Sequence, residues 1–464
     1  MDITAPLRRS DSTWPAATAV WTVAAIVALA DAPGYVSRDG VVQWYDGRYG
    51  FTSGYPGHPP LMSVVWGLFD RVWPGPAPML LLQLGLFAAA LALALQTARP
   101  RPLLAIALAA SVLLQPYIFS NLARINKDVL GGSAVLLALA LAIPRGRTRW
   151  WPVVLAGGLI AMAALYRYQF AVAAPIYVWI VYRSSGARLA LVGIASMAVA
   201  GLGLFGLVLI GPTPPSDVQA SMRKIIAYDL AGIAADVPGA HLTTITVPGV
   251  DPAEIVRRMR AEYSTAKVDT LWDAGQESTM ELLNRVPMPA MRQAWVQEVT
   301  RHPSAFIHHR LATFARVLGL GEMTECAVVS RTPTAHDPPE LAEVLRTDQL
   351  TPPFMLRVLR WRIFSVESFL FRPIFYVGLA VMGCAVTLVW RSRNPATVWA
   401  RWSLLLALAY WGTFLALPQA CDGRYSFLPI TLTMLVATLS AVAAARAMVV
   451  ARWGAARASR AAVK

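Results

Sequence analysis

The chain alternates between long apolar blocks and short polar segments that are rich in Arg. Most of the blocks run for about 17 to 23 residues, the length at which a helix crosses roughly 30 Å of hydrocarbon. An all-α polytopic membrane protein is therefore the expected fold class. We predict ten membrane-spanning helices, over residues 14–31, 77–97, 103–119, 128–143, 150–166, 168–182, 189–211, 371–390, 398–418 and 425–446.

The basic residues between the blocks predict the orientation in the membrane. Short cytoplasmic loops of multi-pass proteins carry an excess of Lys and Arg. If the N-terminus is cytoplasmic, every short loop on that side is basic, provided that residues 59–73 lie on the outer surface as a juxtamembrane helix. We therefore expect a bacterial inner-membrane protein with both termini in the cytoplasm and residues 14–31 retained as a signal anchor. The basic loop residues are Arg99, Arg101, Arg145, Arg147, Arg149, Arg183, Arg188, Arg391 and Arg393.

Two hydrophilic regions then lie outside the cell membrane. The predicted division is an N-terminal membrane module at 1–211 with a first outer loop at 31–76, a mainly helical outer soluble domain at 212–370, C-terminal membrane helices at 371–446 and a basic cytoplasmic tail at 447–464. Cys326 and Cys421 both fall on the outer side, where a disulfide between them is possible. Cys384 falls within a span and is expected to pack there.

Composition supports lipid as the solvent and changes how the net charge is interpreted. Hydrophobic residues make up 56% of the chain and charged residues only 14%, so a soluble enzyme is not expected. The formal charge of +15 lies mostly in the short loops, and it therefore reflects topology rather than a nucleic-acid partner. The sequence also lacks the internal repeat that is typical of many transporters.

Carboxylates outside the soluble domain and the leader gather at the outer ends of the predicted helices. Ionisable groups near hydrocarbon are costly and tend to be paired or functional. Asp39, in the first outer loop, either caps a short helix or acts as a general base for an acceptor hydroxyl that attacks a sugar carbon. His58 either bonds the backbone of a turn or contacts substrate. The carboxylates are Asp31, Asp39, Asp46, Asp70, Asp128 and Asp422.

Four basic residues, Arg124, Lys127, Arg167 and Arg424, fall on the outer side, which the charge rule disfavours. One explanation is that they bind a lipid-linked phosphate, since Arg offers a bidentate fork and Lys a point charge. The alternative is that they pair with Asp128 and Asp422 or with the headgroups of membrane lipids. Further residues expected to orient sugar or acceptor are Gln43, His58, Asp128, Tyr166, Gln169 and Tyr425.

Several short motifs, taken in order, resemble the GT-C glycosyltransferases, which include protein mannosyltransferases and lipid A aminoarabinose transferases. The soluble region also carries His302-Pro303 and His309-Arg310-Leu311, a pattern similar to that of bacterial members of the group. The motifs are Asp39 with Gln43, Pro59-Pro60-Leu61, Asn126-Lys127-Asp128 and Arg424-Tyr425.

This resemblance implies an enzyme, a hexosyl- or pentosyltransferase that moves a sugar from a polyprenyl-phosphate donor to a cell-envelope glycan, lipid or protein. It implies Asp39 as the catalytic base and outer basic residues as ligands of the donor phosphate. Asp39 is followed by Gly40, so a metal-binding Asp-X-Asp motif is missing. We expect no cofactor, and a need for a divalent metal stays open.

Two other functions share some of these features. A transporter or flippase of lipid-linked intermediates would also need a basic cavity, but it predicts charges near mid-span and repeated halves, and the sequence has neither. An O-antigen ligase or polymerase would also have a large outer loop. It would depend on residues of that loop, such as His309 and Arg310, more than on Asp39.

Overall fold

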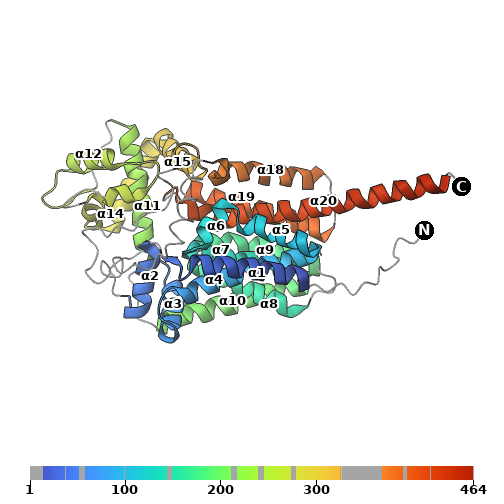
Figure 1. Cartoon of the computed structure of the whole chain (residues 1–464). Coiled ribbons are helices and arrows are strands. Elements are labelled where there is room, and N and C mark those ends of the chain that lie inside the picture. Colours follow the sequence, from blue (N-terminus) through green and yellow to red (C-terminus); the bar gives the residue numbers. More distant parts are fainter. Residues whose placement is uncertain are drawn as a thin grey trace.

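The computed structural model describes residues 14–36, 38–51, 58–98, 100–143, 149–210, 217–238, 245–272, 278–323, 326, 368–389, 394–417 and 420–462. Helices dominate these ranges and form an elongated bundle with a smaller helical unit at one end (Figure 1). The bundle contains α1 (Trp14–Asp31), α4 (Ala77–Ala98), α5 (Pro102–Leu113), α6 (Pro116–Leu122), α7 (Lys127–Leu141), α8 (Trp150–Tyr166), α9 (Ala173–Ser185), α10 (Ala187–Ile210), α18 (Pro373–Val389), α19 (Pro395–Ala416) and α20 (Phe427–Ala462).

Among the described residues, three stretches of helix are long and apolar enough to cross a membrane: Ala77–Ala98, Ala187–Leu209 and Gly423–Met448. The bent pair Pro102–Leu113 and Pro116–Leu122 passes the same test when it is taken as one span. Large apolar side chains project from the bundle; on α10, for example, Val199 is 72% and Leu202 73% exposed. Soluble proteins rarely expose continuous apolar surface of this kind. The described helices thus indicate a multi-pass membrane protein, while the count of ten spans stays a prediction.

Helix α7 forms the centre of the bundle and is buried on every side. Its first turn is fixed by Asn126, whose side-chain oxygen accepts a hydrogen bond of 2.9 Å from the backbone N–H of Asp128. Farther along, Gly131 admits the ring of Phe170, because a Cβ at this position would lie 2.5 Å from the Cε2 atom of that ring. The cap and the glycine together hold Lys127 and Asp128 at the N-terminal end of a tightly packed helix.

The predicted continuous helix over 103–119 is wrong. The structure has two helices there, α5 and α6, bent by 73° relative to each other. Pro116 has no N–H to continue α5, and the side chain of Gln115 accepts a 2.7 Å hydrogen bond from the N–H of Ile118, which starts α6. At the other end of the chain, α20 runs past the predicted boundary at 446 and continues as helix to Ala462.

The second unit, called the outer unit after its predicted location, contains α11 (Asp217–Asp236), α12 (Pro252–Glu262), η2 (Val268–Trp272), α13 (Thr279–Asn284), α14 (Met288–Arg301) and α15 (Pro303–Val317). It has its own apolar core, separate from that of the bundle, around Leu230, Met259, Leu271, Leu282 and Met291. In Figure 1 it covers one end of the bundle, whereas the C-terminal half of α20 extends beyond the other end. Residues 327–367 of the predicted outer domain lie outside the described residues.

One strand pair connects the first outer loop to the rest of the chain, and one helix pair packs within the loop. Strands β1 (Tyr35–Val36) and β2 (Arg124–Ile125) pair in parallel, which brings the loop beside the start of α7. Helix α2 (Arg38–Tyr49) packs on α3 (Leu61–Val72), the predicted juxtamembrane helix. This crossing is close because both helices contribute a glycine: a Cβ on Gly67 would lie 2.2 Å from the carbonyl oxygen of Gly47.

A disulfide bond joins Cys326 to Cys421, the pairing that the sequence leaves open. The backbone N–H of Cys421 also donates a 2.7 Å hydrogen bond to the carbonyl of Ala266 in the outer unit. These contacts fasten the turn before η4 (Gly423–Ser426) to the outer unit.

Candidate active site

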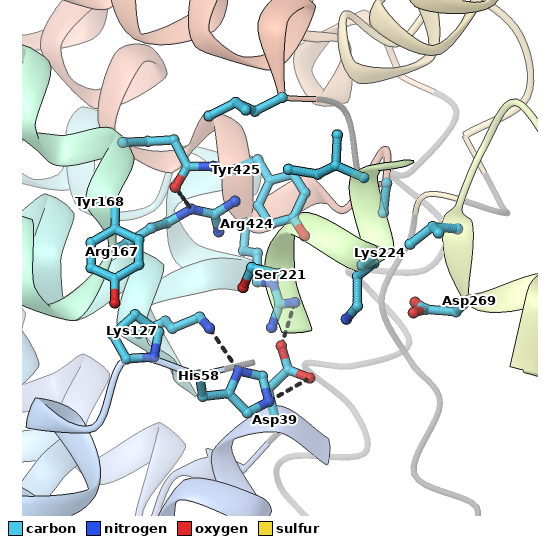
Figure 2. Close-up of a pocket in the computed structure, with 16 residues that line it drawn as sticks. Asp39, His58, Lys127, Arg167, Tyr168, Ser221, Lys224, Asp269, Arg424 and Tyr425 are labelled. Carbon is cyan, nitrogen blue, oxygen red and sulfur yellow. Dashed lines mark hydrogen bonds and ion pairs between the residues drawn. The ribbon is translucent and has the colours of Figure 1, made fainter. Parts of the chain in front are cut away.

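A cavity lies where the outer unit meets the bundle, and its walls come from both (Figure 2). Its empty volume is about 900 Å³, a figure that includes the part open to solvent. Residues from both ends of the sequence meet here, because the β1–β2 pairing and the packing of η4 on α7 carry distant segments to one place. The cavity is lined by seven of the residues predicted from sequence: Asp39, His58, Lys127, Arg167, Gln169, Arg424 and Tyr425.

Asp39 occupies the first turn of α2 and directs its carboxylate into the cavity. One carboxylate oxygen lies 2.6 Å from Nη2 of Arg424, and the side chain is 28% exposed. Burial alone would raise the pKa of Asp39, but the charges of Arg424 and Lys127 lower the pKa well below its ordinary value. The side chain is therefore an ionised carboxylate with a guanidinium partner rather than only a cap.

His58 lies between Asp39 and Lys127, and its side-chain contacts differ from those of a turn histidine bonded to the backbone. Its Nδ1 is 2.7 Å from Nζ of Lys127, and its Nε2 is 3.8 Å from a carboxylate oxygen of Asp39. Burial and then the ammonium of Lys127 lower the pKa of His58 to about 3, although Asp39 acts in the other direction. The ring is thus neutral near pH 7, with Nδ1 accepting from Lys127 and Nε2 carrying the proton.

Arg424 and Arg167 share the buried carboxylate of Asp128 behind the cavity wall. The Nε atom of Arg424 lies 3.3 Å from Asp128 and 2.8 Å from Asp422. Arg167 pairs with Asp128 and also lies over the ring of Tyr425, its Cζ 4.1 Å from the ring centroid. The ion pairing that the sequence offers as an alternative is therefore present, and it fixes the two guanidinium groups where they face the cavity.

Four predicted site residues do not line the cavity. Arg124 is buried behind it, 3.5 Å from Asp422, so it supports the carboxylate that holds Arg424. Asp128 is likewise buried behind the two arginines. Gln43 and the hydroxyl of Tyr166 are buried away from the wall and have no hydrogen-bond partner among the described residues.

Sequence reasoning missed Lys224 and Ser221 of α11, Asp269 of η2, and Tyr168. A weak signal was available for Lys224, because the chain uses Lys at only four positions, and two of them line this cavity. Among the described residues no ion pair joins Lys127 or Lys224 to a carboxylate; Lys127 contacts His58, and Lys224 lies over the ring of Trp272. Within the described part of the chain, the cavity therefore presents two ammonium groups that no ion pair joins to a carboxylate.

His309 and Arg310, the residues on which a ligase would depend, lie outside the cavity wall. Both contact the buried carboxylate of Asp229, at 3.2 Å and 2.6 Å. Arg310 also donates to the carbonyls of Leu415 and Ala416 at the end of α19. This buried cluster fastens the outer unit to the bundle, which is a structural role.

The described residues contain no group of three or more His, Cys, Asp or Glu side chains arranged to hold a metal ion. Asp39 in the cavity wall and Asp128 and Asp422 behind it are each paired with a guanidinium group. The dependence on a divalent metal, open from the sequence, stays untested.

Comparisons with known proteins give little beyond this geometry. No protein-family model matches the chain, and no curated protein matches its sequence. Among solved structures, the chain is similar to ArnT from Cupriavidus metallidurans, whose crystal structure is bound to undecaprenyl phosphate. The match covers 91% of this chain and 77% of that chain, with 14% sequence identity and a TM-score of 0.34. The function proposed below therefore rests on the cavity.

Proposed function

We propose that this chain is a membrane glycosyltransferase of the GT-C type, which moves a sugar from a polyprenyl-phosphate donor to a cell-envelope glycan, lipid or protein at the outer face of a bacterial inner membrane. The observation that carries the proposal is the meeting of one ionised carboxylate, Asp39, with Lys127, Arg167 and Arg424 in a single cavity at one end of an apolar helical bundle. This combination supplies a base and a phosphate site side by side.

The cations suit the charge that develops on the leaving group. In a single displacement, the acceptor oxygen bonds to the sugar carbon while the bond from that carbon to the phosphate oxygen breaks. The phosphate gains negative charge as it leaves, and fixed cations stabilise this charge more in the transition state than in the ground state. Lys127, Arg167 and Arg424 are held for this role by His58, Asp128 and Asp422.

Asp39 would take the proton of the acceptor hydroxyl, but its pair with Arg424 weakens it as a base. A donor phosphate competes for the same guanidinium group, since carboxylate and phosphate bind it in similar ways. When the phosphate takes Arg424, Asp39 loses its nearest cation and its basicity rises. Donor binding therefore prepares the base, and without donor the carboxylate is kept inactive.

Neutral His58 would then orient the sugar or the acceptor, and it would not itself remove the proton of the acceptor hydroxyl. Its Nδ1 lone pair accepts from Lys127, and the protonated Nε2 faces Asp39, so no lone pair is left to remove a proton. Gln169, whose side-chain oxygen accepts a 2.9 Å hydrogen bond from Nε of Arg167, and Tyr425 would contact the sugar or the phosphate.

The test is transfer from a radiolabelled polyprenyl-phosphate sugar by the full chain in lipid nanodiscs, with envelope extracts as a source of acceptor. Asp39→Asn is expected to insert and fold normally but to lose transfer. Asp236→Asn removes a carboxylate of the outer unit that does not line the cavity, and it should keep full activity. If the Asp39→Asn variant transfers sugar as fast as the wild type does, Asp39 is not the base.

A further inference from the structure

The lysines of the cavity lie on opposite walls. Lys127 begins α7 in the bundle, whereas Lys224 lies on α11 in the outer unit. In Figure 2 the carboxylate of Asp39 lies between His58 and Lys127 on one side and Lys224 on the other. The positive charge of the cavity is thus divided between two places rather than concentrated in one.

Lys224 is held in position by its surroundings. The preceding residue, Arg223, donates 2.6 Å hydrogen bonds to the carbonyls of Leu283 and Val286, which fixes this turn of α11 against α13. The ammonium of Lys224 lies 4.9 Å from the ring centroid of Trp272, a cation–π contact. Ser221, one turn earlier on the same face of α11, lines the cavity as well.

The charge of Lys224 is not explained by the proposed base. Its positive charge helps to lower the pKa of Asp39 and that of His58. A cation in this place opposes proton abstraction by Asp39 unless an anionic ligand neutralises it. Asp269 lines the same wall, but no ion pair joins it to Lys224 among the described residues.

We propose that Lys224 and Ser221 form a second anion subsite, separate from the one made by Lys127, Arg167 and Arg424. Its ligand is a phosphoryl or carboxylate group, bound by the ammonium and the hydroxyl from the aqueous side of the cavity. The proposal rests on the function proposed above, because it assigns the first subsite to the donor phosphate next to the bundle. The second anion belongs either to the donor, as the outer phosphate of a diphosphate, or to a separate acceptor molecule.

The experiment measures binding to the full chain in lipid nanodiscs with three probes: a polyprenyl monophosphate, a polyprenyl diphosphate, and inorganic phosphate added after saturation with the monophosphate. Lys224→Gln keeps a polar side chain, one atom shorter than that of Lys, and removes its charge. We expect this variant to bind the monophosphate as the wild type does and to lose roughly fivefold or more in affinity for a second anion. Lys267→Gln removes the same charge from a residue of the outer unit that does not line the cavity. This control variant should bind all three probes as the wild type does.

The arms of the experiment separate the two sources of the anion. A loss confined to the diphosphate assigns the subsite to the donor, and a loss confined to added inorganic phosphate assigns it to a separate molecule. Unchanged binding of both in Lys224→Gln, or an equal loss in Lys267→Gln, would overturn the proposal. If the wild type does not bind the monophosphate, the proposed function fails. The second subsite is then still tested by comparing the binding of inorganic phosphate to the wild type and to Lys224→Gln.

Discussion

The pair between Asp39 and Arg424 leads to an unusual expectation: the Asp39→Asn variant should bind polyprenyl phosphate more tightly than the wild type while it loses transfer. The carboxylate lies 2.6 Å from Nη2 of Arg424 and competes with the phosphate for it. Asn is nearly isosteric but carries no charge, so the substitution removes the competitor without opening a cavity. If Asp39 only helped to shape the site, the substitution would instead weaken the binding of polyprenyl phosphate.

The size of the effect follows from the contacts. A hydrogen bond to a charged group contributes about 1.5–3 kcal/mol, but Asp39 is 28% exposed, and Arg424 keeps Asp128 and Asp422 as partners. Discounting for solvent and for these partners leaves about 1 kcal/mol. That energy corresponds to binding that is roughly fivefold tighter.

The assay is equilibrium binding of a radiolabelled polyprenyl phosphate to protein in nanodiscs, compared among wild type, Asp39→Asn and Asp236→Asn. The thermal unfolding midpoint of each preparation serves as the folding control. Asp236→Asn should bind like the wild type, because its carboxylate contacts His308 and lies outside the cavity wall. Unchanged or weaker binding by a well-folded Asp39→Asn variant would refute the competition for Arg424.

Three further outcomes are expected. The pKa of His58 is lowered to about 3, so the ring stays neutral above that pH. The pH profile of kcat/KM should therefore lack a histidine titration step at about pH 6.5, and such a step would refute the assignment of His58 as neutral. Gly232→Ala places a Cβ 2.2 Å from Nδ1 of His309, and we therefore expect the Tm in a thermal melt to be several degrees lower. An unchanged Tm would show that the buried cluster of His309, Arg310 and Asp229 is not rigid. Replacing both Cys326 and Cys421 by Ser should cost about 2–4 kcal/mol of stability, measured by denaturant unfolding under oxidising conditions, and equal stability would count against a role of the disulfide in fastening the outer unit.

Much of the local structure could be predicted from the sequence because its causes are local. Apolar blocks form helices in lipid, since every backbone polar group must be satisfied within the segment. The cap of α7 can be read from Asn126, and both Asp39 and Arg424 stand out as charges beside apolar segments. The bend between α5 and α6 was missed, although Pro116 marks the place, because hydrophobicity is continuous across it.

The composition of the site depended on tertiary structure. The sequence predicts Arg124, Gln43 and Tyr166 as site residues, but all three are buried and do not line the cavity, because packing against neighbours decides which side chains face it. Lys224 entered the site because the outer unit covers the end of the bundle, so that α11 and α7 line one cavity, an arrangement that no local pattern encodes.

The sequence by itself determined an apolar helical protein with a set of charges at the outer helix ends, because hydrophobic length and charge are properties of each segment alone. Only the tertiary structure decided that Asp39 meets Arg424, since they lie near opposite ends of the chain and depend on the β1–β2 pair and the packing of η4 against α7. It also decided that the cations divide between two walls, because one wall belongs to the bundle and the other to the outer unit.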